Sequence, residues 1–154
     1  DPGVARLGLA VVARRERKPV IVWTGTVLTS RRTPESERLH AISLAVRAAL
    51  LEHRPGSVAL ERVAWNVNKA SAMAVARATG VVMAAAAEAG VPVEEYGSLE
   101  VKNAITGSGA ADKAQIHAQL TSLAAAESLR LTNVFWDSVK EVVSGAVAIA
   151  FAAL

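Results

Sequence analysis

The feature that most constrains the fold is a short apolar strand that carries a single carboxylate. Residues 58–63 read Val-Ala-Leu-Glu-Arg-Val, so Glu61 sits in a stretch apolar enough to lie inside a sheet. Burying an unpaired charge is costly, and a basic side chain or a metal ion usually neutralises one. Asp1, in an Asp-Pro-Gly turn, is a second carboxylate of this kind. Carboxylates on two separate strands predict a divalent-metal site, whereas the plain alternative is a turn-forming aspartate and a glutamate paired with Arg62 or another base.

Composition limits the class of protein and the kind of metal site that this chain can form. The chain has 154 residues, 52% of them hydrophobic, which is enough for one domain with a substantial core. It contains no cysteine, so thiolate metal sites and disulfides are excluded. The net charge of +3 permits nucleic-acid binding without requiring it. The apolar stretch 142–154 is too short to span a bilayer and predicts a core helix.

Hydrophobic periodicity predicts an α/β domain with a mixed sheet. Strands are expected at 6–13, 20–29, 57–63 and 91–96, the first two forming a hairpin. Helices are expected from Thr33-Pro34, as N-cap and first helical residue, to about His53, and over 69–89, 99–105, 112–127 and 136–154. Small residues of the 69–89 helix would allow another helix to approach closely, namely Ala72, Ala76, Gly80, Ala84 and Ala87. We expect a single domain over 1–154. Because an Asp-Pro-Gly turn normally follows a strand or a helix, we also expect that its first strand is truncated before residue 1.

Two further segments carry residues suited to nucleic acid. Lys102 lies on the expected short helix, and Lys113 begins the helix that follows the glycine-bearing loop at 106–111. Backbone N–H groups at such a helix start can bind phosphate, and flanking lysines can follow a nucleic-acid backbone. Trp65, beyond the Glu61 strand, can stack on an unpaired base. The plain alternatives are solvated surface lysines and a tryptophan buried in the core.

Taken together, these segments resemble the RuvC-type Holliday junction resolvases. The resemblance rests on Asp1-Pro2-Gly3, Ala59-Leu60-Glu61-Arg62-Val63, Asn68, Gly90-Val91-Pro92-Val93, Val101-Lys102, Thr106-Gly107-Ser108-Gly109 and Ala111-Asp112-Lys113-Ala114-Gln115, in that order. It implies an RNase H-like fold with a mixed five-stranded sheet flanked by helices, and a homodimer whose dimer face is the Ala-rich helix. It also implies nicking of four-way DNA junctions, dependent on Mg²⁺ or Mn²⁺, in recombination and repair. The implied setting is cytoplasmic and nucleoid-associated, with a branch-migration helicase as a further partner.

The resemblance implies roles for individual residues as well. Asp1 and Glu61 would be metal ligands, and Lys113 would stabilise charge at the scissile phosphate. The family has an aromatic wedge three residues after the strand glutamate, where this chain has Ala64, so Trp65 would take that role from the next position. The implied DNA contacts are Lys102, Lys113, Trp65 and Asn68.

The last helix departs from the family pattern. The family places two metal-binding residues, at i and i+3, directly before a small apolar run that corresponds here to 146–150. Val142 and Gly145 occupy those two positions, and neither side chain can bind a metal.

The nearest carboxylates to those positions are Asp137 and Glu141, four residues apart and so on one face of the expected helix. We expect Glu141, with Asp137, to complete the metal site of Asp1 and Glu61. Two alternatives stay open. One is a junction-binding relative that does not cleave because its metal site has decayed. The other is a nuclease of the same fold that acts on a different branched or damaged DNA.

Overall fold

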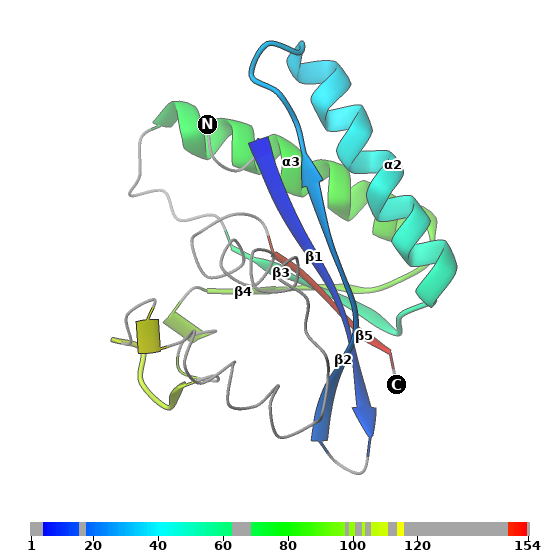
Figure 1. Cartoon of the computed structure of the whole chain (residues 1–154), viewed down its shortest axis with the longest axis vertical. Helices are drawn as coiled ribbons and strands as arrows, with labels where there is room; N and C mark the ends of the chain where they lie inside the picture. Colours follow the sequence, from blue (N-terminus) through cyan, green and yellow to red (C-terminus); the bar gives the residue numbers. More distant parts are fainter. Residues whose placement is uncertain are drawn as a thin grey trace.

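A mixed five-stranded sheet with two long helices makes up the described part of the molecule (Figure 1). The computed structural model describes residues 5–15, 18–62, 69–97, 99–100, 103, 106–110, 114–115 and 148–153. In chain order the elements are β1 (Arg6–Arg15), β2 (Lys18–Leu28), α2 (Glu35–His53), β3 (Ser57–Glu61), α3 (Lys69–Glu88), β4 (Val93–Tyr96) and β5 (Ala148–Ala153). The expected α/β class with a mixed sheet is confirmed.

The sheet has the strand order β2-β1-β5-β3-β4. β1 and β2 form the expected antiparallel hairpin, with a register shift between Val11 and Val12 that is typical of a bulge in an edge pair. β5 runs parallel to β1 and antiparallel to β3, and β3 runs parallel to β4. β1 and β3 therefore point in opposite directions, so the start of β1 and the end of β3 lie at the same end of the sheet.

The expectation of a helix continuing to residue 154 is wrong for Ala148–Ala153, which forms β5 at the centre of the sheet. Alanine favours helix, but the letters Ala-Ile-Ala-Phe-Ala-Ala also alternate small and large residues with the period of a strand. A slot between β1 and β3 offers backbone hydrogen bonds on both sides of the segment, and such tertiary pairing overrides intrinsic propensity. The rest of that expected helix, 136–147, lies outside the described residues.

The core lies between one face of the sheet and the helices α2 and α3. One face of α2 lies against the sheet, since Ile42, Val46 and Leu50 are buried and Leu39 packs against the same cluster while partly buried. The buried cluster also takes alternate residues of two strands and one face of α3, namely Leu7, Leu9, Val11, Val58, Leu60, Ala74, Ala78, Val82, Ala85 and Ala86. Alternate strand residues face the same side, so β1 and β3 both turn this apolar set toward the helices.

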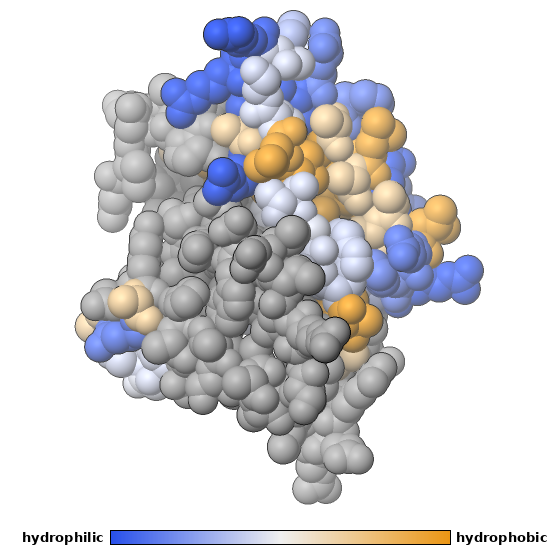
Figure 2. All heavy atoms as spheres, in the orientation of Figure 1, coloured by the Kyte–Doolittle hydropathy of each residue, from blue (hydrophilic) through white to orange (hydrophobic). Residues whose placement is uncertain are grey.

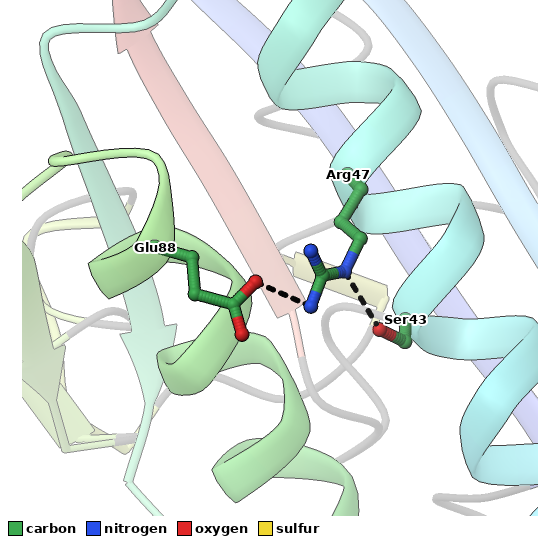
Figure 3. Close-up of polar contacts among 3 residues, drawn as sticks. All are labelled: Ser43, Arg47 and Glu88. Carbon is green, nitrogen blue, oxygen red and sulfur yellow. Dashed lines mark hydrogen bonds and ion pairs between the residues drawn. The ribbon is translucent and has the colours of Figure 1, made fainter.

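Polar contacts on the surface join the two helices. Arg47 of α2 forms an ion pair with Glu88 of α3, and its Nε donates a hydrogen bond to the Ser43 Oγ at 3.2 Å (Figure 3). Arg77 of α3 bonds to Glu35 at 2.6 Å, near the start of α2. These pairs are exposed, so they contribute little stability but restrict how the helices slide past each other.

The start of α2 differs from the expectation by one residue. Pro34, with ψ of 143°, is the N-cap, and Glu35 is the first helical residue, so Thr33 does not cap the helix. Arg38 in the first turns is buried, and its Nε donates to the Thr29 Oγ1 at 3.0 Å. After the end of α3, Gly90, with φ of 70°, takes the left-handed conformation that glycine adopts without strain.

The later helices are only partly covered by the described residues. Residues 99, 100 and 103 are helical, as are 114 and 115, in agreement with the expected helices at 99–105 and 112–127 where these can be compared. Residue 106, expected as the first residue of the loop, is also helical. Among the helices of the described residues, none has the length and apolar character to cross a membrane.

Candidate active site

Glu61 is the last residue of β3 and lies on the side of the sheet away from α2 and α3. Burial alternates along the strand, with Val58 and Leu60 buried and Ser57, Ala59 and Glu61 intermediate. The carboxylate is therefore half-buried at a strand end, where it is less desolvated than in the strand interior that the sequence suggested. Glu61 also has at least one interaction partner in the structure, so it is not an isolated charge.

Arg62, the base considered as a partner of Glu61, is held in another direction. Its guanidinium donates to the carbonyl oxygen of Glu95 at 3.2 Å, and its backbone N–H donates to the carbonyl of Tyr96 at 2.8 Å. Both contacts tie the chain after β3 to β4. They leave Glu61 at the carboxyl ends of two parallel strands, where side chains from neighbouring strands converge.

Two residues of β4 share the face on which Glu61 lies. The parallel register pairs Glu61 with Tyr96 and Ala59 with Glu94, and paired residues in a sheet project to the same side. The Tyr96 hydroxyl donates a hydrogen bond to the Glu94 carboxylate. That bond and the charge of Glu94, together with burial and the charge of Glu100, raise the pKa of Tyr96 above its usual 10.0.

The sequence alone did not single out Glu94 and Tyr96. Their place at the end of the strand that follows the Glu61 strand could have indicated them. If 57–63 and 91–96 are neighbouring parallel strands, the acidic end of the second must lie beside Glu61. Without the register, however, nothing in the sequence says which of Glu94 and Glu95 shares its face.

β1 begins at the end of the sheet where β3 finishes with Glu61. Leu60 pairs with Ile149, which in turn pairs with Leu9 of β1. Glu61 is one step beyond that row, on the side from which the chain enters β1 at Arg6. Asp1 itself is outside the described residues, but only four residues separate it from the start of the strand.

The expected phosphate-binding loop at 106–111 is described over its first five residues. Gly107 has φ of 73°, and its N–H donates to the Asn103 carbonyl at 2.8 Å. The N–H of Ser108 donates to the Thr106 hydroxyl at 3.2 Å, and that of Ala110 donates to the Ser108 hydroxyl at 3.3 Å. Three backbone N–H groups of the loop are thus already hydrogen-bonded, two of them within the loop and one to Asn103 before it.

Of the predicted site residues, only Glu61 falls in the part of the chain that the structure describes. The others lie outside it, namely Asp1, Trp65, Asn68, Lys102, Lys113, Asp137 and Glu141. Within the described ranges, no three carboxylate, imidazole or thiol side chains come together as a metal-binding group. A group of three such ligands that included Glu61 would need residues beyond these ranges.

The chain is similar to known proteins of one family. The family model of the crossover junction endodeoxyribonuclease RuvC matches residues 1–152. The RuvC protein of Mycobacterium avium is 43% identical over 129 residues, covering 83% of this chain and 69% of that protein. The RuvC protein of Streptomyces griseus is 42% identical over 124 residues, covering 80% of this chain and 61% of that protein.

Solved structures agree with the sequence relatives. The Thermus thermophilus RuvC structure superposes with a TM-score of 0.76 at 30% identity, covering 97% of this chain and 96% of that one. A second structure, T. thermophilus RuvC in complex with Holliday junction substrate, gives 0.70 at 24% identity, covering 93% and 99%, and supports the fold alone. Fold and site together define an α/β nuclease domain of the RNase H-like class. The chain belongs to the RuvC family of crossover junction endodeoxyribonucleases.

Proposed function

We propose that this protein resolves four-way DNA junctions by metal-dependent hydrolysis of phosphodiester bonds. The observation that carries the proposal is the position of Glu61, a half-buried carboxylate at the carboxyl end of β3 in a chain that the RuvC family model matches over residues 1–152. An oxygen ligand held at the end of a rigid strand is suited to a hard divalent cation.

The donor chemistry near Glu61 fits Mg²⁺ or Mn²⁺. Glu61 supplies carboxylate oxygen on the face that carries Glu94 and Tyr96, and the chain has no cysteine to favour a softer metal. We assign Asp1 and Glu61 as ligands and Glu141, with Asp137, as the residues that complete the set. Bound metal would supply water activation and stabilisation of the leaving 3′ oxygen.

The residues of the chain bind and orient the DNA in this proposal. Lys113 stabilises negative charge at the scissile phosphate. Lys102 and Asn68 contact the backbone near it, and Trp65 stacks on a base exposed at the junction centre. Each of these roles depends on a cation, an amide or an aromatic ring close to Glu61.

We further propose that two copies act as a homodimer. A four-way junction has approximate two-fold symmetry, and a two-fold dimer presents two active sites to it. On α3, Gly80, Ala84 and Ala87 are exposed, and space around Gly80 is open to 4 Å. Small exposed residues on one side of a helix suit close contact with a second copy. A branch-migration helicase is a further partner in this proposal.

A second candidate is a junction-binding protein that does not cleave. The observation that favours it is the presence of Val142 and Gly145 where the family has its last-helix ligands. With only Asp1 and Glu61 as ligands, one ion would bind weakly, whereas a two-metal mechanism needs several carboxylates around ions about 3.5–4 Å apart.

One assay separates the two candidates. The protein is incubated with an end-labelled four-way junction and either Mg²⁺ or Mn²⁺, and binding and nicking are measured in parallel. We expect paired, symmetrical nicks. Tight binding without nicks under both metals would establish the second candidate instead. Where nicking occurs, Glu141→Gln tests the third ligand, and undiminished cleavage would remove Glu141 from the site.

A further inference from the structure

Arg31 and Arg32 stand exposed on the turn that joins β2 to α2. Neither guanidinium makes a hydrogen bond or an ion pair, as far as residues 5–15, 18–62 and the other described ranges show. The helix arginines behave differently, since Arg47 and Arg77 each pair with a glutamate of the neighbouring helix. Within the described residues, neither of these two side-chain cations therefore takes part in a polar contact that would stabilise the fold.

The turn that carries these arginines is held in one conformation. The backbone N–H of Thr33 donates to the Ser30 carbonyl at 3.1 Å, and that of Arg32 donates to the Ser30 hydroxyl at 3.1 Å. At its start, the N–H of Thr29 donates to the Ala5 carbonyl at 2.9 Å, which fixes the turn to the beginning of β1. Binding a ligand here would therefore cost little ordering of the backbone.

The surroundings of the turn leave its charge uncancelled. Residues 29–34 include Arg31 and Arg32 and no acid. The next acid along the chain, Glu35, is engaged with Arg77. Hydrophilic side chains gather at the top of the molecule, where Figure 1 places this turn (Figure 2). The result is a local positive charge, with Glu37 as the closest exposed acid in the helix that follows.

The turn lies at the same end of the sheet as Glu61. Leu28, at the end of β2, pairs with Arg6 at the start of β1, and this is the end at which β3 finishes. Three strand spacings separate β2 from β3 in the order of the sheet, or about 14 Å at 4.8 Å each, and the turn lies beyond the end of β2, so Arg31 and Arg32 are at least that far from Glu61. A duplex arm that leaves the cleavage site toward the turn can cover that distance along its length.

We infer that Arg31 and Arg32 bind backbone phosphates of a duplex arm of the junction, at a place separate from the cleavage site. The inference rests on the proposed function, because it takes branched DNA as the ligand. The partner is recognised by charge alone, so the turn would add affinity and fix the arm's direction without reading its sequence.

The test is the salt dependence of binding to a four-way junction without divalent metal. Each phosphate contact contributes about 0.9 to the slope of log affinity against log salt. We expect Arg31→Gln and Arg32→Gln each to reduce that slope by about 0.9 and to weaken binding about eight-fold at 0.1 M salt. The Arg31→Lys and Arg32→Lys variants should keep the slope, since a phosphate contact needs the charge more than the guanidinium shape.

The matched control is Arg54→Gln. Arg54 is an exposed arginine at the other end of α2, about 28 Å away along a 19-residue helix. We expect its slope to equal that of the unaltered protein. Equal slopes for all three glutamine variants would overturn the inference, whether none of them changes or all change alike.

A second measurement locates the contact. Single phosphates of one arm are replaced by uncharged methylphosphonates, one position at a time. With phosphates about 3.4 Å apart along a strand, we expect a loss of affinity at about the fourth phosphate from the nick or farther along the arm. That loss should disappear in the Arg31→Gln/Arg32→Gln double variant, and its persistence there would contradict the inference. The proposed function fails separately, if the unaltered protein does not bind or nick the junction.

Discussion

Glu61 and Tyr96 are paired in register at the carboxyl ends of β3 and β4, and both lie on the side of the sheet away from the helices. Tyr96 is bonded to Glu94 on that same side. The carboxylate that the RuvC resemblance assigns to metal binding thus has an acid and a phenol as its strand neighbours.

Substituting Glu61 should abolish cleavage while sparing binding. In Glu61→Gln one carboxylate is lost at the proposed metal site, and we expect junction nicking to fall at least about 100-fold, since even outer-shell changes at metal sites cost 10–100-fold. Affinity for the junction without metal should be equal or higher, because a negative charge near phosphates is removed. Single-turnover nicking and gel-shift binding measure the two effects. Glu52→Gln, an exposed glutamate on α2, should change neither, and normal nicking by Glu61→Gln would contradict the assignment.

Tyr96 should ionise at a higher pH than a free tyrosine. Its hydroxyl donates to Glu94, which holds the pKa above 10.0, so the tyrosinate absorbance in the near ultraviolet should appear late in an alkaline titration. The chain has one tyrosine, so the signal belongs to Tyr96. Because the pKa is raised on folding, the stability that this bond contributes is present below pH 10 and is lost as pH rises through the raised pKa. Glu94→Gln should return the titration toward pH 10.0, and an unchanged curve would show that Glu94 is not the cause.

Two glycines should respond in opposite ways to alanine. A Cβ at Gly25 would lie 2.8 Å from Cζ2 of Trp23, whose ring is also packed against His53 at 5.1 Å between centroids. We expect Gly25→Ala to lower the free energy of unfolding by about 1–3 kcal/mol. At Gly80 nothing lies within 4 Å of such a Cβ, so Gly80→Ala should raise it by about 0.5–1 kcal/mol through helix propensity. Urea denaturation measures both, and a stable Gly25→Ala variant would mean that the Trp23 ring can move aside.

The exposed side of α3 should respond to a charge if it is the dimer face. In Ala84→Arg a long cation is added to the stripe formed with Gly80 and Ala87, which would hold two copies apart. We expect a monomer in sedimentation experiments, with an unchanged helix content. Ala41→Arg, at an exposed alanine of α2, is the control and should stay dimeric. A dimeric Ala84→Arg protein would place the interface elsewhere.

Local periodicity was enough to predict the scaffold around the site. Ile42, Val46 and Leu50 recur at helical spacing and are buried on α2, and the short apolar run that contains Val58 and Leu60 indicates the strand β3, where both are buried. These patterns depend on neighbours three or four residues apart, or two apart in a strand. These patterns can therefore be recognised in the sequence without the tertiary structure.

Contacts between distant segments could not be predicted in this way. Arg38 lies on the buried side of α2, where its Nε donates to the hydroxyl of Thr29, nine residues earlier, a contact that neither helical nor strand periodicity indicates. Glu94 rather than Glu95 shares the side of Glu61 because the register of β4 against β3 decides it, and a shift of one residue would reverse the choice.

By itself the sequence determined the class of the fold, the limits of most of its strands and helices, and Glu61 as the residue on which to look for chemistry. Only the tertiary structure decided that Ala148–Ala153 is the middle strand of the sheet, that Tyr96 and Glu94 of the neighbouring strand share the face that carries Glu61, and that Arg31 and Arg32 lie at the same end as the site. The physical reason is how far apart along the chain the interacting residues are. Helix and strand patterns are set by side chains a few residues apart, whereas strand order, register and the joining of a site depend on hydrogen bonds and packing between segments far apart in the chain.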